Sequence, residues 1–291
     1  MRKRQYLVAN VRLKGKKITY IETGKRNGKS PLLMIPGWPI SVISLLPLMK
    51  LLGLKFWCIA LNLPGYGSSE TNSKHFHSFD FYSEFIQKFK EQVLQTKKVN
   101  FFGHSTGGVH GLNYALNYAN SLNKLIIFSP PFNGVEQLEK TAKQYKSAIY
   151  LFYALKKWPR LIYLFQPKKI RYFIANWLFK LFYIKRYPDI ASLDREFVQA
   201  ILIDTCNFNA KAIFDNVLHL SLSEFDKLAH NLKKETLVIA AENDHAVSAK
   251  DSKRLANLLV KGEFIEIPKV GHDVVITQPH LVANHIIDFI G

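Results

Sequence analysis

The stretch from Val99 to Gly108, V-N-F-F-G-H-S-T-G-G, constrains the fold of this chain more than any other. A short apolar run ends at Gly103, Ser105 follows, and a helix-compatible segment begins after two further glycines. A strand that turns this sharply into a helix leaves no room for side chains two residues before or after the apex, and Gly103 and Gly107 meet that condition. The pattern predicts a strained strand–turn–helix with the Ser105 hydroxyl exposed at its apex and the Thr106 N–H at the helix start.

Strand and helix patterns alternate along the chain on both sides of this turn. Besides the strand before Ser105, strand patterns occupy residues 5–13, 16–22, 31–35, 56–61, 124–128, 236–240 and 264–267. Besides the helix after Ser105, which should run to about residue 120, helical patterns occupy residues 41–52, 79–96, 249–259 and 279–289. Most of the strand patterns are continuous apolar runs joined by short connections, which favours a mainly parallel sheet with helices on both faces.

The alternation stops at Ser129-Pro130-Pro131 and resumes at Thr236. Between these points the sequence to about Phe225 is mostly helical, aromatic and basic, and we find no internal repeat or low-complexity linker. We therefore predict one α/β core formed by residues 1–130 and 226–291, with residues 131–225 inserted as a helical cap.

Basic side chains strongly outnumber acidic ones: 40 Lys and Arg face 22 Asp and Glu, which gives a net charge of +18. Such an excess favours an anionic neighbour, although a uniformly lysine-rich, solvated surface would give the same total.

Cys58 lies in an apolar run and is expected to be a buried core thiol, and two cysteines form no disulfide framework. The basic N-terminus has no signal-peptide pattern, because Arg12 cuts its apolar run short. We expect a cytoplasmic protein with peripheral membrane contact.

Two further strand patterns end in groups that could activate a serine. Residues 236–240 run into Glu242-Asn243-Asp244, and residues 264–267 run into a loop that contains His272. A serine hydroxyl is a poor nucleophile unless a base lies within hydrogen-bond reach and a carboxylate orients that base. Since the carboxyl ends of parallel strands meet at one edge of a sheet, Ser105, His272 and an acid are expected to converge there. Either Glu242 or Asp244 could supply the acid.

Taken together, the motifs resemble those of the α/β-hydrolase superfamily. They are G-H-S-T-G-G, P-G-W-P, N-L-P-G-Y-G-S, E-N-D-H-A-V-S and V-G-H-D-V-V. The resemblance implies an eight-stranded, mainly parallel sheet with a helical cap inserted. It also implies that Ser105 is the nucleophile, His272 the general base and acid, and Asp244 the orienting carboxylate, with an oxyanion hole formed by the backbone N–H groups of Trp38 and Thr106.

Two departures from the common family pattern concern the subfamily. Pro36-Gly37 stands where many relatives have His-Gly, and Asn62 stands where many have Asp, but both changes keep the backbone donors. A serine at position 105 argues against epoxide hydrolases and haloalkane dehalogenases, which need a carboxylate nucleophile. His104 is expected to pack beneath the turn, and Asp273 to be a solvated or helix-start carboxylate. The other histidines lack metal-ligand spacing, and no nucleotide-binding motif is present, so we expect neither metal nor cofactor.

The resemblance thus implies a serine hydrolase that cleaves small hydrophobic carboxylic esters through an acyl-enzyme. C–C bond hydrolases, amidases or peptidases, and non-catalytic ligand receptors share the fold and remain alternatives.

The insertion contains an apolar stripe of helical spacing, which predicts a face packed on the core. The stripe consists of Ile170, Phe173, Ile174, Trp177, Leu178, Leu181 and Phe182. Off this stripe, Tyr172, Phe179 and Tyr183 lie among lysines and arginines, a mixture typical of anionic membrane interfaces. We expect no nucleic-acid partner, because no recognition fold accompanies the charge.

Overall fold

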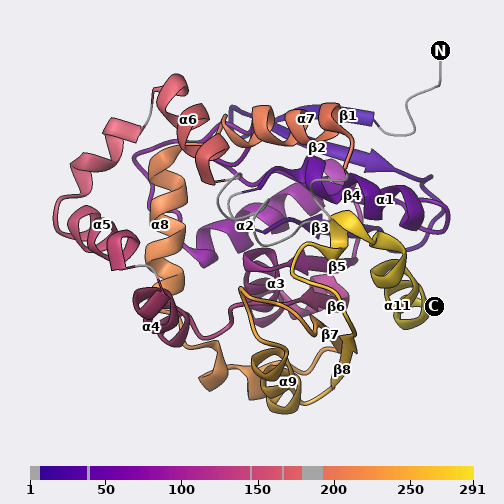
Figure 1. Ribbon diagram of the computed structural model, residues 1–291. Coiled ribbons are helices and arrows are strands. Elements are labelled where there is room, and N and C mark those ends of the chain that lie inside the picture. Colours follow the sequence, from indigo (N-terminus) through magenta and orange to yellow (C-terminus); the bar gives the residue numbers. More distant parts are fainter. Residues whose placement is uncertain (1–6, 38–39, 145, 166, 179–192) are drawn as a thin grey trace.

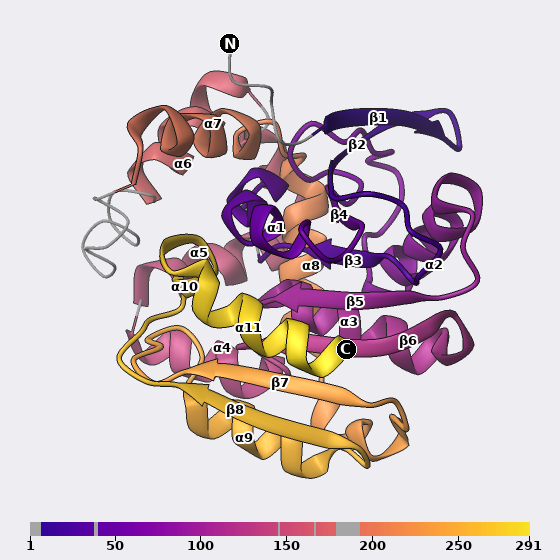
Figure 2. The same cartoon turned by 90° about the vertical axis from the view of Figure 1, so that its right-hand side faces the viewer.

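The computed structural model describes residues 7–37, 40–144, 146–165, 167–178 and 193–291, and its ribbon is drawn in Figures 1 and 2. Eight strands form one sheet in the order β1-β2-β4-β3-β5-β6-β7-β8. Their bounds are β1 (Leu7–Leu13), β2 (Lys16–Thr23), β3 (Leu32–Ile35), β4 (Cys58–Leu61), β5 (Val99–His104), β6 (Leu122–Phe128), β7 (Thr236–Ala241) and β8 (Gly262–Ile267). The predicted α/β architecture, with a mainly parallel eight-stranded sheet, is confirmed.

Only the first part of the sheet is antiparallel. β1 and β2 form the predicted hairpin, whose turn residues Lys14 and Gly15 have φ values of 49° and 75°. β2 pairs antiparallel with β4, and from β4 onward every neighbouring pair is parallel. The carboxyl ends of β3 through β8 consequently lie at one edge of the sheet, and the loops that follow these strands are brought together there.

Helices cover both faces because each strand in the middle of the sheet is apolar on both sides. One face packs against α1 (Leu46–Leu52), α10 (Val274–Thr277) and α11 (Pro279–Ile290), and the opposite face against α2 (Phe79–Phe89), α3 (Thr106–Asn117) and α9 (Ala249–Leu258). Figure 2 is viewed from the side of α1 and α11, which lie in front of the sheet. Cys58 in β4 is fully buried, as the apolar run around it predicts.

Two predicted helices are more irregular than their sequence patterns suggest. The segment from Ser41 begins as a 3₁₀-helix, with the Ser41 side chain accepting the Ile43 N–H as its N-cap, and α1 starts only at Leu46 with Pro47 in its first turn. The helix expected over residues 79–96 ends as a π-helix over Lys90–Leu94. There the buried Lys90 ammonium donates to the Lys97 carbonyl and to the Ser121 hydroxyl, which draws the last turn inward.

In the described part of the segment predicted as a cap, five α-helices lie between β6 and β7. They are α4 (Gly134–Gln144), α5 (Lys146–Lys157), α6 (Lys168–Leu178), α7 (Arg195–Thr205) and α8 (Ala210–Ser221), and the 3₁₀-helix η4 (Pro159–Phe165) joins α5 to α6. The boundaries at residues 131 and 225 stay a prediction. Within the described part of the chain, no helix combines the length and apolarity needed to cross a membrane.

Two residues of the predicted apolar stripe over 170–182 do not pack on the core as predicted, while the side chains of Ile174, Trp177 and Leu178 lie outside the described part of the structure. Ile170 and Phe173 are 42 % and 71 % exposed, and Tyr172 beside them is 44 % exposed. The prediction was wrong for these positions because helical spacing marks one apolar face without identifying what covers it. Residues 179–182, together with Tyr183, lie outside the described residues.

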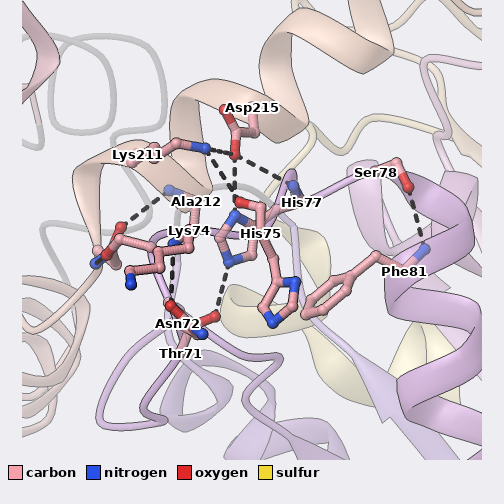
Figure 3. Close-up of polar contacts among 12 residues, drawn as sticks. Thr71, Asn72, Lys74, His75, His77, Ser78, Phe81, Lys211, Ala212 and Asp215 are labelled. Atoms are coloured by element: carbon pink, nitrogen blue, oxygen red, sulfur yellow. Dashed lines mark hydrogen bonds and ion pairs between the residues drawn. The ribbon is translucent and has the colours of Figure 1, made fainter. Parts of the chain in front are cut away.

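A buried polar cluster ties α8 to the loop that follows β4 (Figure 3). His77 Nδ1 donates to Asp215 Oδ2 over 3.0 Å, and the Lys211 ammonium donates to the same oxygen over 2.6 Å. With its proton on Nδ1, His77 accepts a 2.7 Å hydrogen bond from the Thr71 hydroxyl at Nε2. Burial opposes ionisation of Asp215, but the hydrogen bonds from His77 and Lys211 outweigh it, so the pKa of this carboxyl is lowered.

A second polar cluster lies at the C-terminal end of α7. The Asp204 carboxylate accepts hydrogen bonds from the hydroxyls of Ser41 and Ser68 and from the Asn62 side-chain amide. Ser41 follows β3, whereas Asn62 and Ser68 follow β4, so this one carboxylate links two core loops to α7. Together, Asp204 and Asp215 fix the inserted helices at the carboxyl edge of the sheet.

We predict that Asp215→Asn lowers the free energy of unfolding at pH 7 by about 1–3 kcal/mol, because it leaves buried donors of His77 and Lys211 without an anionic acceptor. Since the folded-state pKa of Asp215 is lowered, its contribution is complete above the ordinary aspartate pKa near 3.9 and is lost as the pH falls through the lower folded value. Urea unfolding of wild type and variant between pH 7 and pH 3 measures this difference, which should shrink in acid.

Glu84→Gln is the matched control, because Glu84 pairs with Lys14 and Lys88 but its side chain is 52 % exposed. An exposed pair of this kind contributes less than about 1 kcal/mol. Equal effects of the two substitutions would contradict the assignment of Asp215 as an anchor between α8 and the core.

Candidate active site

Ser105 stands at the turn between β5 and α3 with a strained backbone. Its φ of 55° and ψ of −123° lie outside the regions that serine ordinarily adopts. The turn is held by a 2.8 Å hydrogen bond from the Ser105 N–H to the Phe128 carbonyl of the neighbouring strand. A Cβ at Gly103 would lie 2.2 Å from the Gly107 carbonyl oxygen, and a Cβ at Gly107 would lie 2.2 Å from that of Ile35. The glycine requirement inferred from the sequence is confirmed.

His272 and Asp244 meet at the same edge of the sheet, in the loops after β8 and β7. His272 Nδ1 lies 2.6 Å from Asp244 Oδ2, and the Asp244 side chain is fully buried. The other carboxylate oxygen accepts the N–H groups of Ala246 and Val247 over 2.8 and 2.9 Å. Asp244 is thereby held with one oxygen toward the imidazole, which fixes the histidine proton on Nδ1 and leaves Nε2 as the acceptor.

The two members of this pair favour each other's charged form. Burial disfavours the imidazolium of His272, but the Asp244 carboxylate outweighs that effect and raises the pKa of His272 above its ordinary value near 6.5. For Asp244, burial is likewise opposed and outweighed by His272 and by the Val247 N–H, so the pKa of Asp244 is lowered. Near neutral pH, Asp244 is therefore a carboxylate beside a readily protonated imidazole.

Glu242, the alternative acid in the sequence, points elsewhere. Its carboxylate accepts the backbone N–H of Lys269 over 2.7 Å at an exposed position. This contact ties the loop after β7 to the loop after β8, on which His272 stands. Glu242 thus supports the arrangement of the two loops, while Asp244 contacts the imidazole.

The base is surrounded by three further polar residues whose contacts the sequence does not reveal. His104 packs beneath the turn as expected, and its Nε2 also donates to the His272 carbonyl over 3.0 Å, with the two rings 4.7 Å apart. Burial lowers the pKa of His104 to about 3, so this ring stays neutral. Ser129, directly after β6, is fully buried, and its N–H donates to the Ile239 carbonyl of β7 over 2.9 Å. Its position between two strand ends that carry Ser105 and Asp244 is the signal that could have identified it.

Of the two alternatives expected for Asp273, the structure shows the helix-start carboxylate. Asp273 stands directly before α10 and is only 5 % exposed, so it is not solvated. The residues that follow it, Val274 and Val275, are part of the buried core. The charge of Asp273 helps to raise the pKa of His272.

The predicted nucleophile and base lie on neighbouring loops without a direct bond. Among the described residues no hydrogen bond joins the Ser105 hydroxyl to His272, although His104, next to Ser105, contacts the His272 backbone. Catalytic hydrogen bonds are often long without a substrate and tighten when one is bound. The pairing of Ser105 with His272 therefore belongs to the proposal below.

Of the two predicted oxyanion donors, one can be located. Thr106 is the first residue of α3, where its N–H points out of the helix N-terminus beside Ser105. Trp38 lies outside the described residues, but Gly37 before it approaches the serine so closely that a Cβ there would lie 2.9 Å from Ser105 Cβ. In the described part of the chain, no three His, Cys, Asp or Glu side chains are grouped so that they could hold a metal ion.

Comparison with known proteins agrees with this architecture. The family model described as "alpha/beta hydrolase fold" matches residues 30–279. The chain is 26 % identical over 277 residues to the uncharacterized hydrolase YugF of Bacillus subtilis (strain 168), with 93 % of each protein covered. Among solved structures, a hydrolase from Pseudomonas aeruginosa PA01 superposes with a TM-score of 0.75 at 14 % identity, covering 98 % of each chain. A thermophilic esterase from Thermogutta terrifontis gives 0.71 at 17 % identity with the same coverage. The chain belongs to the alpha/beta hydrolase fold family.

Proposed function

We propose that this hydrolase-family protein is a serine esterase that cleaves carboxylic esters with a hydrophobic acyl group through an acyl-enzyme intermediate. The observation that carries this proposal is the 2.6 Å hydrogen bond between His272 and the buried Asp244, at the same sheet edge as the strained Ser105. Membership in a hydrolase family and the likeness to an esterase agree with it.

In the proposed reaction, the Ser105 Oγ attacks the ester carbonyl carbon while His272 Nε2 takes the hydroxyl proton. Asp244 stays ionised and stabilises the imidazolium, and the backbone N–H groups of Thr106 and Trp38 bind the oxyanion. When the C–O ester bond breaks, His272 gives its proton to the departing alkoxide. Water then attacks the acyl-enzyme and gives its proton to His272, which returns a proton to the Ser105 oxygen as the acid leaves.

The apolar character of the inserted segment supports the preference for a hydrophobic acyl group. The cavity next to Thr106 is too small to hold an acyl chain, and its lining combines Ile35, Leu63 and Tyr66 with the polar Asn62 and His110. The inserted segment, which is attached to core loops at this edge of the sheet, is rich in apolar and aromatic residues.

We predict that kcat/KM for p-nitrophenyl esters rises from the acetyl to the octanoyl ester, severalfold for each methylene that becomes buried. Ser105→Ala should lower kcat by about a million-fold, because removing the nucleophile of a triad abolishes the acyl-enzyme route. Steady-state hydrolysis of the ester series measures both effects. A preference for acetyl over octanoyl would argue against a hydrophobic acyl group, and faster cleavage of the matched anilides would favour an amidase.

We also predict that a fluorophosphonate probe labels Ser105 by forming a P–Oγ bond with loss of fluoride. Intact-protein mass spectrometry should show one adduct on wild type and none on Ser105→Ala. If wild type stays unlabelled while small hydrophobic ligands raise its unfolding temperature, the protein is a receptor on the hydrolase fold and the enzymatic proposal fails.

The activity should also depend on pH. His272 must be neutral to accept the serine proton, so kcat/KM should rise with pH through a midpoint above 6.5, because Asp244 raises the pKa of His272. Asp244→Asn should move this midpoint to lower pH and lower kcat by about 10⁴-fold, since the amide no longer fixes the required tautomer. Glu242→Gln is the matched control and should leave the midpoint in place, as Glu242 contacts only the Lys269 backbone. If Glu242→Gln moved the midpoint and Asp244→Asn did not, Glu242 would be the triad acid.

A further inference from the structure

The outer surface of the inserted segment carries a dense cluster of exposed apolar side chains. Of the nineteen exposed large hydrophobic residues in the described part of the chain, ten lie within residues 150–173 of α5, η4 and α6. Six of these are aromatic: Tyr150, Tyr153, Trp158, Tyr163, Tyr172 and Phe173. Phe173 is 71 % exposed and Leu164 is 64 % exposed, so most of each residue is in contact with solvent and not packed against neighbouring residues. We call residues 150–173 the aromatic face.

The inner side of the same helices is already packed. Leu155 of α5 and Ile162 of η4 are 7 % exposed and form a small core with Ala210 and Phe214 of α8. Figure 1 shows α5 and α6 at the outer edge of the molecule, with α8 between α5 and the sheet. The aromatic face is therefore apolar surface beyond what folding of the insertion uses. Contiguous surface of this kind is typical of a binding site for another molecule.

Basic residues are concentrated in the part of the sequence that contains this face. Residues 140–188 contain 12 Lys and Arg and no Asp or Glu, whereas the rest of the chain contains 28 basic and 22 acidic side chains. This segment thus supplies +12 of the net +18, which a uniformly lysine-rich surface would not produce. Lys156, Lys157, Arg160, Lys168 and Lys169 are all exposed, and none forms a salt bridge to a carboxylate among the described residues.

We propose that the aromatic face docks the protein on the surface of a lipid bilayer that contains anionic lipids. Exposed tyrosine and tryptophan rings favour the headgroup level, Leu164 and Phe173 can enter the acyl boundary, and the lysines pair with lipid phosphates. Lys157 already lies over the Trp158 ring at 4.8 Å, so a cation and an apolar surface are presented together. A second copy of the chain is a poorer occupant, because pairing two such faces would oppose one excess of positive charge with another. Nucleic acid would leave the aliphatic side chains of the face in water.

The test is co-sedimentation of the full chain with phosphatidylcholine vesicles, with or without phosphatidylglycerol. We expect binding to the phosphatidylglycerol vesicles, little binding to phosphatidylcholine alone, and loss of binding as salt screens the charges. Lys156→Gln/Lys157→Gln should weaken binding by about 30-fold, from the typical contribution of a lysine at an anionic surface. Lys250→Gln/Lys261→Gln, at exposed sites on and beside α9, is the charge-matched control and should change binding by less than about threefold.

A second pair of variants tests the contribution of apolar side chains to vesicle binding. Leu164→Ser should weaken binding to the anionic vesicles at least fivefold, whereas Leu54→Ser, at a leucine that is 85 % exposed elsewhere on the core, should not. Unfolding midpoints of all variants confirm that they are folded. Binding to both vesicle types alike, an equal effect of the two lysine pairs, or self-association or duplex DNA binding in place of vesicle binding would overturn the proposal. Because the readout is sedimentation, it is independent of whether Ser105 cleaves esters.

Discussion

The parallel alignment of β3 through β8 is the constraint on which the rest of this molecule depends. It brings six loops to one sheet edge although they are spread over more than two hundred residues of sequence. Ser41, Asn62, Ser105, Ser129, Asp244 and His272 all follow these strands, and the contacts of His272 with Asp244 and with His104 join different loops of this edge. A single antiparallel strand among these six would send its loop to the opposite edge.

The strained backbone of Ser105 is tolerated because the strands around it are rigidly packed. A left-handed serine costs on the order of 1–3 kcal/mol, and the cost is offset by packing that leaves the turn no alternative. Gly107 lies so close to the Ile35 carbonyl that any side chain there would collide with β3, and the Ser105 N–H is fixed by β6. The strands on either side of β5 thus hold the hydroxyl at the apex. The same packing places the Thr106 N–H beside it, so a nucleophile and an electrophilic donor come from one turn.

The sequence was sufficient to propose Ser105, Asp244 and His272 because each follows a strand pattern, fully buried in β5 and β7 and partly buried in the edge strand β8. It was not sufficient to choose between Glu242 and Asp244 from the residues alone, since two carboxylates two positions apart differ only in where the loop turns them. Asp204 and Asp215 were not identified, because their partners in the core loops lie more than 130 residues away and no sequence pattern links them. The sequence did not decide between a solvated and a helix-start position for Asp273, because a four-residue helix leaves little periodic signal.

In this strongly basic protein the buried carboxylates lie near one edge of the sheet, whereas basic residues are concentrated in the inserted segment. The buried carboxylates of the described residues are Asp215, Asp244 and Asp273, and all three lie near the carboxyl edge of the sheet. Each has a histidine as a charge partner, His77 for the first and His272 for the other two. Imidazole suits this role because it can satisfy a buried carboxylate through one N–H without bringing a permanent charge into the interior. Asp215 also has Lys211 as a charged partner, and Lys90 is itself buried. Basic residues are concentrated instead in the insertion, where residues 140–188 contain 12 Lys and Arg and no acidic residue.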